Sequence, residues 1–128
     1  MRWRRLLFRI ARSRLSGLFI GWVFAHMSWA IPVNRLRETD TLIAFYHPSP
    51  SYPVHILIVP KIARRNIESI SATDSDLLLD VFTTVQSIAG ELHLSAYRLI
   101  CNGGDYQDVP QLHFHLTSED KTTDAPQS

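Results

Sequence analysis

The chain has 128 residues, of which 45% are apolar and 20% charged, so it can form one globular domain and is not collagen-like, fully disordered or a coiled coil. Its single cysteine, Cys101, excludes an internal disulfide framework and any site built from several cysteines. The formal net charge of +1 divides unevenly: residues 1–37 hold eight arginines and no acidic residue, whereas residues 38–128 hold five Lys/Arg and twelve Asp/Glu. These two parts are therefore expected to face different partners.

The first fourteen residues contain six arginines, and apolar residues recur between them at intervals of three or four. This spacing predicts a basic amphipathic helix, which we place at residues 1–20. Such a helix can rest on an anionic membrane surface, with arginines at the lipid headgroups and Trp3, Leu7 and Phe8 in the acyl boundary. Specific nucleic-acid binding is less favoured, because aromatic and aliphatic residues interleave the arginines.

Residues 15–33 carry no formal charge, and four interpretations of the N-terminal region stay open. It is an interfacial anchor, a single membrane-spanning helix, or a secretory signal with a small-x-small site at residues 28–30. Alternatively, residues 20–31 form the first core helix of the domain, behind a surface-bound basic helix. We favour this last arrangement, which predicts a cytoplasmic protein at the inner face of the membrane, with a single-pass or secreted protein as the alternative.

The rest of the chain alternates short apolar runs with polar loops. Thr73 and Asp76 indicate a helix start, and apolar residues at helical spacing, Phe82 among them, predict a core helix over residues 74–93 that lies on a sheet. We expect a polar tail over residues 119–128. Four strands are predicted, at residues 41–45, 55–60, 97–101 and 112–116.

The strongest chemical pattern is the alternation in residues 109–116, VPQLHFHL. In a strand, Gln111, His113 and His115 point to one face, with neighbouring side chains about 7 Å apart. His55, which opens another predicted strand, can approach the same face. Three interpretations compete: hydrogen-bonded strand histidines, a metal site formed by His55, His113 and His115, and a histidine nucleophile that attacks phosphorus.

Several segments, taken in order, resemble the histidine triad (HIT) superfamily of nucleotide hydrolases and transferases over about residues 22–117. Residues 31–40 resemble the family's opening, and residues 44–61, AFYHPSPSYPVHILIVPK, are similar to its histidine-containing strand pair. Residues 97–102, YRLICN, and residues 111–116, QLHFHL, resemble its last two strands. The resemblance implies an α+β fold over residues 21–118, with an antiparallel five-stranded sheet, one long helix, an N-terminal helix, and pairing into a homodimer.

The resemblance also implies a reaction, the hydrolysis or transfer of a nucleoside monophosphate group from a phosphoramidate or phosphoanhydride, with no cofactor and no metal. His113 matches the family's nucleophile. His55 and His115 match its phosphate-binding histidines. Asn102 matches a supporting asparagine, and Gln107 and Asp108 match the loop that offers donors to the phosphate.

Two positions depart from the family pattern. Gln111 replaces the first histidine of the triad, and its amide cannot titrate near neutral pH. His47 stands where a ribose-binding aspartate usually lies, so an acceptor for the sugar hydroxyls is lost. The alternative function is therefore a catalytically weakened module that binds a nucleotide or phosphate and is attached to a membrane.

Overall fold

The computed structural model describes residues 35–121. The predicted basic helix, the uncharged segment 15–33 and the end of the polar tail lie outside the described residues. Among the described residues, no helix is both long enough and apolar enough to span a bilayer.

Within residues 35–121, five antiparallel strands form one sheet in the order β1-β2-β3-β5-β4. The strands are β1 (Arg35–Glu38), β2 (Leu42–Tyr46), β3 (Val54–Pro60), β4 (Arg98–Ile100) and β5 (Phe114–Ser118). The expected five-stranded antiparallel sheet is thus confirmed. The first strand was not among the four that we predicted from residue patterns, because Arg35, Arg37 and Glu38 give it a polar sequence.

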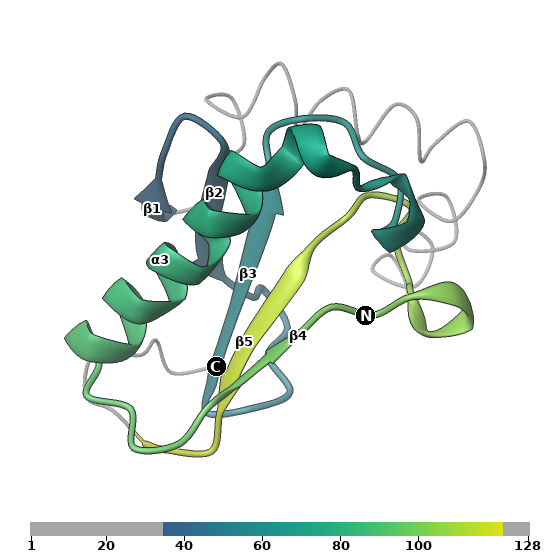
Figure 1. Cartoon of the computed structure of the whole chain (residues 1–128). Coiled ribbons are helices and arrows are strands. Elements are labelled where there is room, and N and C mark those ends of the chain that lie inside the picture. Colours follow the sequence, from purple (N-terminus) through teal and green to yellow (C-terminus); the bar gives the residue numbers. More distant parts are fainter. Residues whose placement is uncertain (1–34, 122–128) are drawn as a thin grey trace.

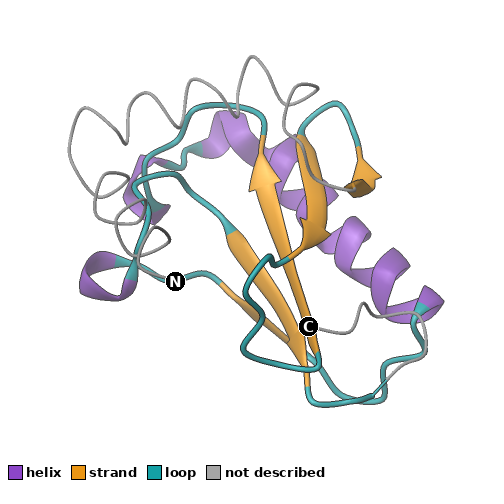
Figure 2. Ribbon diagram, turned by 180° about the vertical axis from the view of Figure 1, so that it is seen from behind, coloured by secondary structure: helices purple, strands orange, loops and turns teal. Residues whose placement is uncertain are grey.

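One long helix, α3 (Ser75–Glu91), crosses one face of this sheet (Figure 1). Its buried residues Leu77, Val81, Val85 and Ile88 share a core with alternate residues of β2, β3 and β5. Because strand side chains alternate between the two faces, the other residues of these strands point away from the helix. Figure 2 shows that opposite face of the sheet from behind.

The helix confirms the predicted element and corrects three details. Phe82 is 58% exposed, since it lies outside the stripe that faces the sheet. Thr73 does not cap the helix: Ser71 and Asp74 form a capping box around the 3-10 turn Ala72–Asp74, and the N-cap of α3, Asp74, makes no side-chain capping hydrogen bond to α3. His93 follows the helix in a left-handed conformation, with φ of 53°, and is not a helical residue.

The last strand begins two residues later than its alternation predicts. Strand β5 starts at Phe114, because Leu112 instead donates its backbone N–H to the carbonyl of Arg64 at 2.7 Å. Residues 61–65 follow β3, so the chain just before β5 is held by a loop and not by the sheet. Cys101 comes one residue after β4; it is half-buried against the core, and burial raises the pKa of its thiol, which agrees with a structural role.

Candidate functional site

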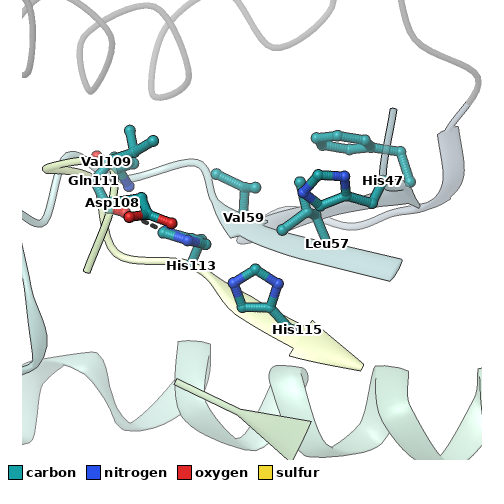
Figure 3. A pocket seen from close by; sticks show the side chains of 9 residues that line it. His47, Leu57, Val59, Asp108, Val109, Gln111, His113 and His115 are labelled. Carbon is teal, nitrogen blue, oxygen red and sulfur yellow. Dashed lines mark hydrogen bonds between the residues drawn. The ribbon is translucent and has the colours of Figure 1, made fainter. Parts of the chain in front are cut away.

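A cavity opens on the sheet face that α3 does not cover. Its floor consists of the apolar side chains of Phe45, Leu57 and Val59, which come from the central strands β2 and β3. Leu57 pairs across the ladder with His115 on β5, so this histidine stands on the same face. Figure 3 shows His113 and His115 in the cavity, with His47 on the far side from Asp108 and Gln111.

His113 is held in one tautomer by the chain just before it. Its Nδ1 lies 2.7 Å from the carbonyl oxygen of Gln111. A carbonyl oxygen only accepts hydrogen bonds, so Nδ1 carries the proton and donates it. In a neutral imidazole the other nitrogen, Nε2, then has a lone pair, which is the electronic requirement for a nucleophile.

His55 and His115 form a second hydrogen-bonded unit. The backbone N–H of Ser51 donates to Nδ1 of His55 at 3.0 Å, which places the ring proton of neutral His55 on Nε2. That nitrogen lies 2.9 Å from Nδ1 of His115 and donates to it. Neutral His115 therefore carries its own proton on Nε2, so it can serve as a hydrogen-bond donor while its neighbour His113 has a lone pair.

Burial keeps this unit uncharged. The pKa of His55 falls from 6.5 to about 4, first because of burial and second because of the charge of His47. The pKa of His115 also falls to about 4, mainly through burial and then through His113 and His55, while Asp108 acts in the opposite direction. Both rings are neutral at pH 7, so each can donate from one nitrogen and accept at the other.

His47 extends the row of imidazole rings. It follows β2 directly, and its ring stacks on that of His55 with 4.3 Å between the centroids. Its Nδ1 accepts the backbone N–H of Ser49 at 2.9 Å. The loop rich in proline and serine after β2 thus supplies the donors, Ser49 and Ser51, that orient two of the four histidines.

The two glutamines near the cavity face the protein scaffold. Gln111 is 2% exposed, and its Nε2 donates to the carbonyl of Ile62 at 3.3 Å. Gln107 donates from Nε2 to the carbonyls of Arg65 and Val109, at 2.8 and 2.9 Å. The amide groups of both side chains therefore brace the loop before β5.

The remaining predicted residues differ in whether they line the cavity. Asp108 lines it, together with Val109. Asn102 follows β4, and neither Asn102 nor His55 is among the described residues that line the cavity. His55 contacts two residues that do, through its hydrogen bond to His115 and its stacking on His47. The apolar floor was missing from our candidates, although the alternation within β2 and β3 would have indicated that Phe45, Leu57 and Val59 share one face.

Comparison with known proteins assigns this arrangement to a family. The sequence model for the HIT domain matches residues 29–122. The chain belongs to the HIT family. It is 37% identical over 89 residues to an uncharacterised HIT-like protein of Synechococcus elongatus, covering 67% of this chain and 78% of that protein. It is 33% identical over 90 residues to the purine nucleoside phosphoramidase of Escherichia coli, covering 67% and 76%.

Solved structures agree with this assignment. The crystal structure of a HIT family hydrolase from Legionella pneumophila superimposes with a TM-score of 0.70 at 29% identity, covering 81% of this chain and 96% of that one. A histidine triad protein from Clostridium difficile superimposes with a TM-score of 0.69 at 26% identity, covering 84% and 95%. The fold inferred from the resemblance, a HIT fold with one long helix on a five-stranded sheet, is therefore confirmed.

The HIT site does not have the geometry of the metal centre that we considered for His55, His113 and His115. Within residues 35–121, no group of three or more His, Cys, Asp or Glu side chains is arranged to hold a metal ion. The facing nitrogens of His55 and His115 share a hydrogen bond instead. The described residues therefore give the metal interpretation no geometric support.

Proposed function

We propose that this HIT protein hydrolyses or transfers a nucleoside monophosphate group through a covalent intermediate on His113. The observation that carries the proposal is the hydrogen bond from Nδ1 of His113 to the carbonyl of Gln111, because it leaves the lone pair on Nε2. The E. coli relative, which is named a purine nucleoside phosphoramidase, supports a purine nucleoside phosphoramidate as the substrate class.

In the first step, Nε2 of His113 attacks the phosphorus atom and forms an N–P bond. The bond from phosphorus to the leaving group breaks, and an amine leaving group departs with that electron pair and takes a proton from solvent. His113 is then a positively charged imidazolium, and the carbonyl of Gln111 stabilises it through the Nδ1–H that it already accepts.

His115 holds the phosphoryl group during this step. Its Nε2–H is a donor for a phosphoryl oxygen, since its Nδ1 is engaged by His55. In the second step, water attacks phosphorus, the N–P bond breaks, and its electron pair returns to Nε2 of His113. The water supplies the oxygen of the product and, by releasing a proton, balances the proton taken by the amine.

One feature favours a second candidate, a nucleotide-binding module with little turnover. The amide of Gln111 is buried and donates to the carbonyl of Ile62. An amide neither gains nor loses a proton near neutral pH, whereas a histidine in that position could do so. A phosphate can still bind at His115 in such a protein.

The test is the turnover of an adenosine phosphoramidate with a fluorescent amine leaving group. We expect the wild type to release the amine and His113→Ala to lose activity by about a thousandfold or more, because the covalent step needs the imidazole. His93→Asn is the matched control; His93 is exposed and has a left-handed backbone that Asn tolerates, so this variant retains wild-type turnover.

The same samples separate the two candidates. Equal turnover in the wild type and in His113→Ala would contradict the nucleophile. If the wild type binds adenosine monophosphate, seen as a rise in its melting temperature, and yet releases no amine, the binding module replaces the enzyme.

A further inference from the structure

The loop over residues 61–65, which we call the carrier loop, supports the chain that leads into β5. Three of its carbonyl groups accept hydrogen bonds from that chain. Ile62 accepts from Nε2 of Gln111 at 3.3 Å, and Arg64 accepts from the backbone N–H of Leu112 at 2.7 Å. Arg65 accepts from Nε2 of Gln107 at 2.8 Å. The position of residues 107–112 thus depends on the position of the carrier loop.

The carrier loop is itself fastened to the start of α3 by Arg64. Its Nη2 lies 2.9 Å from Oδ1 of Asp74, and its Nε donates to Oδ2 at 3.2 Å. The two contacts form a fork that fixes the guanidinium in orientation as well as in position. Hydrogen bonding from Arg64, and then from the backbone of Ser71, lowers the pKa of the Asp74 carboxyl, so the carboxylate stays ionised at neutral pH.

Asp74 is a firm anchor because it is 5% exposed and also caps the turn before α3. Its Oδ2 accepts the backbone N–H of Ser71 at 3.0 Å. Three residues further on, Leu77 is buried in the core between α3 and the sheet. The ion pair therefore connects the loop to a part of the molecule that core packing holds in place.

We propose that Arg64 and Asp74 are positioning residues for His113. The inference rests on the proposed function, in which His113 is the nucleophile. Asp74 holds the side chain of Arg64, the carbonyl of Arg64 holds Leu112, and Leu112 is the residue directly before His113. Gln111, whose carbonyl fixes the tautomer of His113, is bound by the same loop. The pair sets the direction of the nucleophile without touching the substrate.

The expected effect of breaking the pair is a loss of kcat. For Arg64→Gln and Asp74→Asn we expect kcat to fall by roughly 10- to 100-fold, since a displacement of about 1 Å at a reacting group has an effect of that order. KM changes less, because His115 is held on the other side by His55. Arg64→Lys keeps the positive charge but cannot form both contacts to Asp74, so we expect its kcat to lie between those of Arg64→Gln and the wild type. It is measured in parallel as the milder change.

A second readout does not depend on turnover. In the wild type, we expect the backbone amide of Leu112 to exchange slowly with deuterated solvent and the ring nitrogens of His113 to show the shifts of a single tautomer, because both donate hydrogen bonds. In Arg64→Gln we expect faster exchange at Leu112 and averaged nitrogen shifts at His113. If the wild type proves to have no turnover, the proposed function fails, while these two measurements still test the positioning.

Arg37→Gln is the matched control. Arg37 on β1 contacts Ser87 and Glu91 near the C-terminal end of α3. Like Arg64, it is an arginine that pairs with a carboxylate, but at the end of the helix away from the carrier loop. This variant should lose less thermal stability, because Glu91 is 53% exposed whereas Asp74 is buried, and it should keep the wild-type kcat and Leu112 exchange. The proposal is overturned if Arg64→Gln behaves as Arg37→Gln does, with kcat within twofold of wild type and unchanged His113 shifts.

Discussion

The burial of His55 and His115, which lowers the pKa of both rings, makes stability depend on pH. The folded pKa of each is about 4, below the ordinary value of 6.5 that applies to the unfolded chain. Between pH 6.5 and about 4 the unfolded chain therefore binds more protons, and the free energy of unfolding falls as pH is lowered. The expected slope reaches about 1.4 kcal/mol per pH unit for each histidine.

Urea denaturation between pH 4.5 and 7.5 measures this slope. Replacement of both His55 and His115 by Gln should flatten it, whereas His93→Asn should keep it, because His93 is exposed. A double variant with the slope of the wild type would show that other groups carry the pH dependence.

At the residue scale, the alternation predicted that Gln111, His113 and His115 point to one face. All three line one cavity, although the amide of Gln111 turns to the carbonyl of Ile62. Their protonation could not be predicted. The tautomer of His113 depends on a carbonyl two residues away, and that of His115 depends on His55, 60 residues earlier in the chain. The roles assigned to the candidate site residues, Asn102 and Gln107 among them, stay predictions.

At the scale of the element, the two sides of α3 make different contributions to stability. Ile88 is fully buried in the core, whereas Phe82 is 58% exposed. We expect Ile88→Ala to lower the free energy of unfolding by about 2–5 kcal/mol, because it leaves a cavity, and Phe82→Ala to change it by less than about 0.5 kcal/mol. Chemical denaturation of both variants measures the difference; similar losses would mean that Phe82 is buried in solution.

The helix could be predicted from its spacing, since the apolar period is a property of neighbouring residues. Its precise burial could not, because the stripe that faces the sheet is narrower than the run of apolar residues. The polar strand β1 is recruited by pairing with β2, and no pattern within residues 35–38 predicts that pairing.

At the scale of the whole molecule, the uneven charge leads to a prediction about location. The basic residues 1–19 should bind the full chain to vesicles of anionic phospholipid, and a variant without these residues should stay in the supernatant after sedimentation. Added salt should weaken the binding of the full chain, since charge attraction is screened. A truncated protein that still sediments with the vesicles would contradict the anchor. The expected homodimer likewise stays a prediction.

The sequence by itself determined four of the five described strands, the core helix and the face on which His113 and His115 stand, because periodicity and turn composition act over a few residues. The tertiary structure decided the start of β5, the stacking of His47 on His55, and the fork between Arg64 and Asp74. All three features depend on contacts between segments that are separate in the sequence and that the fold brings together. The resemblance to the HIT family pointed to the candidate histidines, while the hydrogen bonds around them decide which nitrogen has the lone pair and which has the proton.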